Sequence, residues 1–226
     1  MPPKNSIKTF VSDSYYHIYN RGVEKRDVFL DRDDYLAFLA DLKFYLSPVI
    51  DFKGTSLKVE RDDKTYHYYP SQLPKNHCEK IQLTSYCLMP NHFHLCIKQA
   101  DRDSMNHFMR SLATKYAMYF NKRYERVGPL FQGIYKAVLV TNESQFIELS
   151  KYIHRNPLKI LPKNSPLSDY PYSSYRNYLG AIHQPWVHPE DITYSYSSKN
   201  QHNSYQTFVE ESESELIDTQ MALEDD

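Results

Sequence analysis

One short segment, residues 92–99 (HFHLCIKQ), constrains the fold most strongly because its polar and apolar side chains alternate. Successive side chains of a β-strand point to opposite faces of the sheet. His92 and His94 would therefore share one face, together with Cys96 and Lys98. The apolar residues that share the other face are Phe93, Leu95 and Ile97. This pattern predicts a strand with one core face and one face that carries two histidines.

Two imidazoles at alternate strand positions lie about 7 Å apart along the chain. At that spacing the ring nitrogens of His92 and His94 can converge on one metal ion, since neutral imidazole is a common metal ligand. The same pattern also fits two half-exposed histidines on a sheet surface. A third ligand and a reacting group are needed before the pair indicates a catalytic site.

The surrounding sequence predicts further strands and helices in a recognisable order. Strands are expected over 14–22, 82–89 and 133–141, and helices over 31–46, 104–124 and 142–155. Asn142 is a suitable N-cap for the last helix, and Pro157 cannot continue it. The resulting order, β-α-β-β-α-β-α, is typical of an α+β ferredoxin-like plait, an antiparallel sheet flanked by helices.

Charge and composition divide the chain into regions. The predicted domain spans 13–160 and is interrupted by a polar, tyrosine-rich excursion at about 50–80. A C-terminal extension covers 161–195, and 196–226 is expected to be an acidic, disordered tail. Eight of the 28 acidic residues lie in 207–226, where Lys and Arg are absent, which leaves 20 acidic against 27 basic residues in 1–206. A basic body is typical of a polyanion binder.

The hydropathy pattern favours a cytoplasmic protein with no membrane contact. The sequence has no apolar run of about 18 residues, and its first residues, MPPKNSIKTF, lack the apolar core of a signal peptide.

The last predicted helix carries a possible reacting group. Tyr152 and Asn156 are four residues apart and would stack one turn apart on a face beside the buried stripe. If that face points to the histidines, Asn156 can supply an oxygen as third ligand and Tyr152 can place its hydroxyl beside the metal. The metal would polarise a phosphodiester while the tyrosine attacks it. The competing interpretation is packing, because the chain has 21 tyrosines.

Four motifs together resemble a known family: YYHIYNRG, LMPNHFHL, LFQGIYKAVLV and YIHRNPLK. Their order and spacing are similar to those of the single-tyrosine HUH transposases, in particular the REP-associated tyrosine transposases and related insertion-sequence enzymes. The resemblance covers about 13–160. It implies that His92 and His94 form the HUH motif, that Tyr152 is the nucleophile, and that Asn156 is the third metal ligand, a position at which some members have glutamine.

The resemblance also implies an activity. It indicates a Mg²⁺- or Mn²⁺-dependent endonuclease that nicks single-stranded DNA next to a hairpin through a 5′-phosphotyrosine link. The released 3′ hydroxyl can then rejoin the strand, as DNA transposition and recombination require.

Two basic segments are predicted to bind DNA. Cations neutralise phosphates, and neighbouring exposed aromatic rings can stack on unpaired bases. The predicted contacts are Arg21, Lys25 and Arg26 at and just after the end of the first strand, and Arg110, Lys115, Lys122, Arg123 and Arg126 along and after the helix at 104–124. The alternative is an amphipathic helix with solvated charges, and for Tyr116 and Phe120 a core position is the preferred interpretation.

Three functions stay open on the sequence alone. The first is the DNA-nicking and rejoining transposase. The second is a non-catalytic, domesticated protein that binds hairpin DNA or RNA, and the third is a metal-dependent phosphodiesterase that uses water as nucleophile. The recognised hairpin and the active unit, a monomer or a homodimer with tyrosines acting in trans, are also left open.

Overall fold

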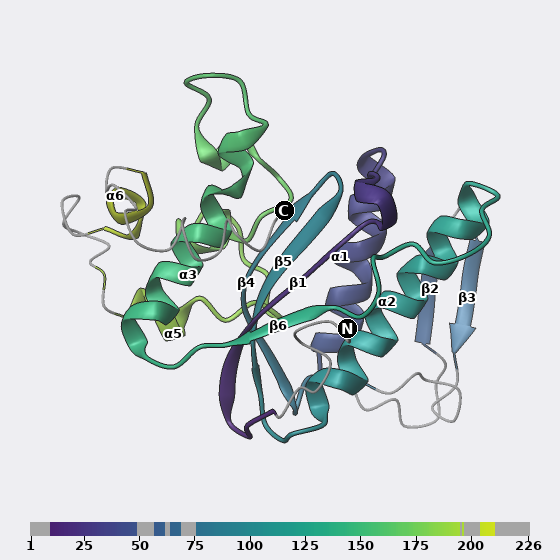
Figure 1. Ribbon diagram of the computed structural model, residues 1–226, viewed down its shortest axis with the longest axis horizontal. Helices are drawn as coiled ribbons and strands as arrows, with labels where there is room; N and C mark the ends of the chain where they lie inside the picture. Colours follow the sequence, from purple (N-terminus) through teal and green to yellow (C-terminus); the bar gives the residue numbers. More distant parts are fainter. Residues whose placement is uncertain are drawn as a thin grey trace, which may run out of the picture.

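A four-stranded antiparallel sheet forms the centre of the computed structural model, which describes residues 10–48, 57–61, 64–68, 76–194, 196 and 204–210 (Figure 1). The strand order is β4-β5-β1-β6. The bounds are β1 (Ser14–Arg21), β4 (Ile81–Met89), β5 (His92–Gln99) and β6 (Lys136–Leu139). The predicted α+β plait is confirmed, and the two histidines lie on β5, a central strand of the sheet.

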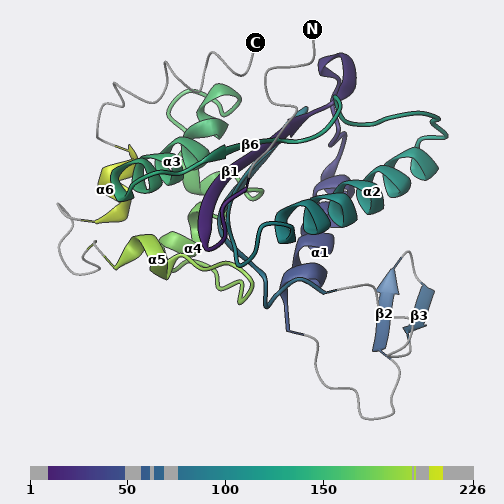
Figure 2. The same cartoon turned by 60° about the horizontal axis from the view of Figure 1, so that its bottom comes forward.

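Two long helices, α1 (Arg32–Leu46) and α2 (Ser104–Arg123), cover one face of this sheet (Figures 1 and 2). Asp31 caps α1 by accepting hydrogen bonds from the backbone N–H groups of Asp33 and Asp34. The core between the helices and the sheet contains Ile18, Phe38, Leu42, Phe93, Leu95, Leu112, Tyr116 and Phe120. The apolar half of β5 therefore faces α1 and α2, and Tyr116 and Phe120 are core residues as predicted.

Helix α3 (Glu143–Arg155) covers the opposite face of the sheet. Its N-cap is Asn142, whose side chain accepts from the backbone N–H of Gln145. A second core joins this helix to the sheet and includes Cys87, Cys96, Leu149, Tyr152 and Ile153. The histidine face of β5 is therefore the face that looks toward α3.

The strand β6 is shorter than the predicted strand at 133–141. Gly133 has a φ of 69°, a left-handed conformation that interrupts an extended strand. The ladder to β1 is consequently limited to Lys136–Leu139, which pair with Tyr16–Tyr19.

The excursion at about 50–80, for which the sequence predicts no element, contains a hairpin. Strands β2 (Leu57–Arg61) and β3 (Lys64–Tyr68) pair antiparallel in a two-stranded sheet of their own.

Short helices follow α3 along the C-terminal part of the chain: η3 (Asn156–Lys159), η4 (Leu167–Asp169), α4 (Tyr175–Tyr178), α5 (Glu190–Thr193) and α6 (Tyr205–Glu210). The extension contacts the sheet edge, since the hydroxyls of Tyr170 and Tyr178 donate to the carbonyls of Leu88 and Thr84. None of the helices in the described part of the chain has the length and apolar character to span a bilayer.

Helix α6 differs from the predicted disorder of 196–226. Tyr205 and Val209 are buried in the core around α3, and this burial stabilises the short helix. Apart from Tyr196 and 204–210, the acidic segment lies outside the described residues.

Candidate active site

His17, His92 and His94 form a row of neighbouring side chains, the histidine row, on the sheet face that α3 covers. His94 is 1% exposed. The ring centroids of His92 and His94 are 5.0 Å apart, and the two ring planes are nearly perpendicular. The register between β1 and β5 places His17 beside Cys96 and Tyr19 beside His94. As a result, Nε2 of His17 lies 2.9 Å from Nδ1 of His94, a hydrogen bond between the two rings.

The surroundings of His94 hold its imidazole in the neutral form. Burial lowers the pKa of His94 well below its usual value, because it removes the water that would solvate the imidazolium; His92, His17 and the positive charge of Lys159 lower it further. A neutral imidazole is the form that binds a metal ion.

The amide of Asn91 orients His92. Nδ1 of His92 lies 2.6 Å from Oδ1 of Asn91, and because an amide oxygen only accepts, the ring must donate from Nδ1. This tautomer leaves the lone pair on Nε2. Hydrogen bonds of this kind fix the orientation of histidines that bind metals.

Helix α3 places Tyr152 directly against the histidine row. The ring centroid of Tyr152 lies 5.5 Å from that of His94 and 5.9 Å from that of His17, with near-perpendicular planes in both pairs. Tyr152 is 9% exposed. The buried stripe of the helix, Leu149 and Ile153, sets this rotation, because it must face the sheet.

Asn156 follows one turn later, at the end of α3. Its Nδ2 donates to the carbonyl oxygen of Tyr152 at 3.0 Å, which fixes the orientation of the amide. Oδ1 of Asn156 and Nε2 of His94 are both buried and make no hydrogen bond within the described part of the chain. Buried polar atoms normally have partners.

These donor atoms fit a divalent cation. Two imidazole nitrogens and an amide oxygen suit Mg²⁺ or Mn²⁺, with positions left for water or a phosphate oxygen. Across the described ranges, no three side chains of His, Cys, Asp or Glu lie close enough to hold a metal by themselves. A metal site built from the predicted ligands would therefore need Asn156 as its oxygen ligand.

A buried hydrogen-bond network fixes α3 from the side away from the histidines. Nδ1 of His154 lies 2.8 Å from the hydroxyl of Tyr205, and Nε2 lies 2.8 Å from Oγ of Ser174. The Tyr205 hydroxyl in turn donates to Oγ of Ser150 at 2.9 Å. Burial lowers the pKa of His154 to about 3, so this ring is neutral and both of its nitrogens are occupied. The network joins the tyrosine helix to α6 and α4.

We expect Tyr205→Phe to destabilise the protein by about 1–3 kcal/mol, because it leaves the buried N–H of His154 without its acceptor. Chemical denaturation measures the change. The matched control is Tyr194→Phe. Tyr194 is an exposed residue whose hydroxyl donates to Glu143, so its loss should change the free energy of unfolding by less than about 0.5 kcal/mol. Equal losses in the two variants would contradict a specific role for Tyr205 in holding α3.

Some of the predicted DNA-binding cations are engaged within the protein. Lys115 forms an ion pair of 2.9 Å with the buried carboxylate of Asp41. Arg123 pairs with Asp31 at 2.7 Å and with Asp34 at 3.0 Å, and so joins the end of α2 to the start of α1. Their role in DNA binding stays a prediction, but the contacts show that both cations also stabilise helix packing.

Other predicted cations are arranged differently. Arg126 donates to Oδ1 of Asn121, and Arg26 pairs with Glu24 at the surface. Lys25 lies in the turn η1 (Val23–Lys25). Arg21, at the end of β1, is opposite His92 in the strand register and is thus adjacent to the histidine row. Arg110 and Lys122 are exposed on α2, and neither takes part in an ion pair among the described residues.

The site residues predicted from the sequence do not include His17, Lys159 or Lys136. The alternation of β1 places His17 on a defined face, but only the register with β5 brings it to His94. Lys136 lies 5.2 Å from the ring centroid of Tyr19, whose ring is 5.9 Å from that of His94. Cations from β6 and η3 therefore flank the histidine row.

Two comparisons with known proteins find similarity in sequence and in fold. A family model described as "Transposase IS200 like" matches residues 56–156, a segment that includes His92, His94, Tyr152 and Asn156. A solved structure of a REP-associated tyrosine transposase bound to a REP hairpin has a TM-score of 0.52 and 14% sequence identity, covering 83% of this chain and 92% of that chain. This structural similarity shows a shared fold. A comparison with curated proteins finds no match. The resemblance to IS200-like single-tyrosine transposases is confirmed.

Proposed function

Because the chain resembles IS200-like transposases in sequence and a REP-associated tyrosine transposase in fold, we propose that it is a DNA transposase with Tyr152 as nucleophile. Its substrate would be single-stranded DNA next to a hairpin, cut and rejoined in the cytoplasm at the nucleoid. The observation that supports this best is the position of Tyr152, whose ring lies 5.5 Å from that of the buried His94.

In the proposed reaction, the phenolic oxygen of Tyr152 attacks a backbone phosphorus atom as its proton leaves to water. The new bond joins the tyrosine oxygen to phosphorus, and the bond from phosphorus to the 3′ oxygen breaks. The 5′ phosphate stays on Tyr152, and the 3′ oxygen takes up a proton. Rejoining is the reverse attack by a 3′ hydroxyl, which conserves the phosphodiester bond.

The protein residues contribute orientation and charge to this reaction. His92, His94 and Asn156 would hold Mg²⁺ or Mn²⁺, which when bound polarises the phosphate. Asn91 orients His92 and His17 orients His94 through the hydrogen bonds described above. Arg21 and Lys159 add positive charge beside the histidine row, where the phosphate would lie.

The geometry also favours a tyrosine that acts on the histidine site of its own chain. Tyr152 contacts His94 and His17 of the same molecule, and the network around His154 and Tyr205 fixes the helix in that place. In this arrangement a monomer would make the first cut. A homodimer with exchanged tyrosines would require α3 to leave these contacts.

The non-catalytic alternative is disfavoured by the residues themselves. A domesticated hairpin binder has no need to keep a nucleophile and three ligands together, yet the tyrosine, both histidines and the asparagine are all present. The water-using phosphodiesterase would need only the metal ligands, so its cleavage activity would not depend on Tyr152.

Incubation with labelled single-stranded hairpin DNA from the flanks of the gene tests the proposal. With Mn²⁺ we expect a protein–DNA band that survives denaturation and carries the 3′-labelled fragment, because the tyrosine holds the 5′ end of the downstream piece. EDTA should remove the band. Binding of several flanking hairpins with no cleavage in Mn²⁺ would contradict the proposal and favour the non-catalytic binder.

A further inference from the structure

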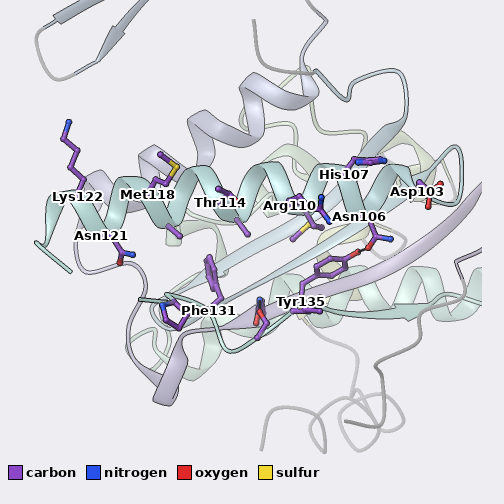
Figure 3. A pocket seen from close by; sticks show the side chains of 17 residues that line it. Asp103, Asn106, His107, Arg110, Thr114, Met118, Asn121, Lys122, Phe131 and Tyr135 are labelled. Atoms are coloured by element: carbon purple, nitrogen blue, oxygen red, sulfur yellow. Dashed lines mark hydrogen bonds between the residues drawn. The ribbon is translucent and has the colours of Figure 1, made fainter. Parts of the chain in front are cut away.

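A groove of about 1070 Å³ runs between α2 and the segment 129–135, away from the histidine row (Figure 3). It lies on the α2 side of the sheet, because Asn20 of β1 lines it while the neighbouring Tyr19 and Arg21 point to the histidine face. The lining residues used below are Arg110, Met118, Lys122, Phe131, Ile134 and Tyr135.

The groove combines apolar surface with cations. Met118 is 68% exposed and Ile134 is 80% exposed, although both are large apolar residues. Phe131 also lines the groove and belongs to the core of the domain. Arg110 and Lys122 lie on the α2 side with no ion pair within the described ranges, whereas Asp103 is an acid at one end. Exposed apolar surface in a hollow that carries cations indicates a binding site for an anion with apolar parts.

Several polar side chains of the lining are hydrogen-bonded within the protein. The hydroxyl of Tyr135 donates to Oδ1 of Asn106 at 2.7 Å, and Nδ2 of Asn121 donates to the carbonyl of Gly128 at 2.9 Å. Oδ1 of Asn121 already accepts from Arg126. The groove therefore offers apolar contact and positive charge, and the side chains of Tyr135, Asn106 and Asn121 are already engaged within the protein.

We propose that this groove binds unpaired nucleotides of single-stranded DNA, with bases on Met118, Phe131 and Ile134 and phosphates on Arg110 and Lys122. Single strands expose apolar base faces between phosphates, which suits this combination and predicts little sequence preference. The inference deepens the proposed function, on which its choice of DNA rests.

Hydrogen bonds at the end of β1 connect the segment that lines the groove to a residue beside the candidate active site. The backbone N–H of Gln132 donates to the carbonyl of Arg21 at 2.7 Å, and the Arg21 guanidinium reaches Oε1 of Gln132 at 3.4 Å. Arg21 is opposite His92, and Gly133 and Ile134, just after Gln132, line the groove. A strand cut beside Tyr152 could thus pass Arg21 and enter the groove, so the groove would hold nucleotides that flank the cut.

Fluorescence anisotropy of a labelled short oligothymidylate, measured in EDTA with the full chain, tests the groove separately from cleavage. Arg110→Gln with Lys122→Gln should raise the Kd about tenfold and reduce the slope of log K against log salt by about 1.4, since each phosphate contact on a single strand contributes about 0.7. Ile134→Ser, a change at an exposed position, should raise the Kd about fivefold with an unchanged salt slope.

The matched control is Arg32→Gln with Lys43→Gln, which removes two exposed cations from α1 outside the groove. This control should change the Kd less than twofold, and circular dichroism checks the folding of every variant. The inference would be overturned if the groove variants bound the oligothymidylate as tightly as the control. It would also be overturned if their affinity for duplex DNA fell as much as their affinity for the single strand. Groove-dependent binding of oligouridylate but not of oligothymidylate would overturn it in favour of RNA.

The outcomes separate the two proposals. If the groove variants bind oligothymidylate normally while Mn²⁺-dependent cleavage is present, the groove inference fails and the proposed function stands. If the groove variants lose binding while the wild-type protein forms no covalent product, the groove inference stands and the transposase proposal fails.

Discussion

Tyr152→Phe is expected to abolish the covalent protein–DNA product and to reduce strand cleavage at least about a thousandfold. The substitution removes only the hydroxyl oxygen, so the nucleophile is lost while the ring keeps its contacts with His94 and His17. Hairpin DNA should bind with unchanged affinity, because the predicted phosphate contacts lie on other residues. Denaturing gels measure cleavage and anisotropy measures binding.

The control for this variant is Tyr15→Phe. Tyr15 lies on the same face of β1, and its hydroxyl donates to Asp191 at 2.9 Å, away from the histidine row. Cleavage by this control should stay within about threefold of the wild type. Full cleavage by Tyr152→Phe would show that water is the nucleophile, and a loss confined to Tyr15→Phe would show that the nucleophile is misassigned.

His92→Ala is expected to lose metal-dependent cleavage by at least about a hundredfold, since even residues that only orient metal ligands contribute tenfold to a hundredfold. His92 is half-buried, so its removal leaves the core of the sheet intact. The variant should also lose the rise in melting temperature that Mn²⁺ gives the wild-type protein, because a ligand that binds the folded state stabilises it. This second measurement needs no DNA.

His183→Ala serves as the control, because His183 is an exposed residue of the C-terminal extension. It should keep both the Mn²⁺-dependent rise in melting temperature and the cleavage. If Mn²⁺ raised the melting temperature of His92→Ala as much as that of the wild-type protein, His92 would not be a metal ligand. A loss of stabilisation in both histidine variants would point to nonspecific binding of Mn²⁺.

Local patterns in the sequence predict much of the site. The alternation in β5 separates His92 and His94 from the apolar residues, and the helical period of α3 places Tyr152 and Asn156 one turn apart. The cap at Asn142 sets the start of that helix. Each of these features depends on residues close together in the chain, for which spacing alone determines the relative orientation.

Contacts between distant segments could not be predicted in the same way. His17 meets His94 because β1 pairs with β5 in a particular register, and no local pattern encodes a register across that separation. Tyr205 reaches His154 from a segment whose composition predicts disorder. Burial against α3 outweighs that local tendency.

The predicted DNA-binding cations illustrate the same limit. The sequence shows that Lys115 and Arg123 lie on a basic helix, but their acidic partners, Asp41 and Asp34, come from α1. Only the packing of the two helices distinguishes cations held in ion pairs from cations that are exposed in the groove, such as Arg110 and Lys122.

The most direct test of the central claim is to identify the residue that carries the DNA. The covalent product formed with Mn²⁺ is digested with nuclease and trypsin, and the nucleotide-bearing peptide is sequenced by mass spectrometry. We predict a nucleotide on Tyr152, in the peptide YIHR that lies between Lys151 and Asn156. A nucleotide on any other tyrosine, or cleaved DNA with no modified peptide, would contradict the assignment of Tyr152 as nucleophile.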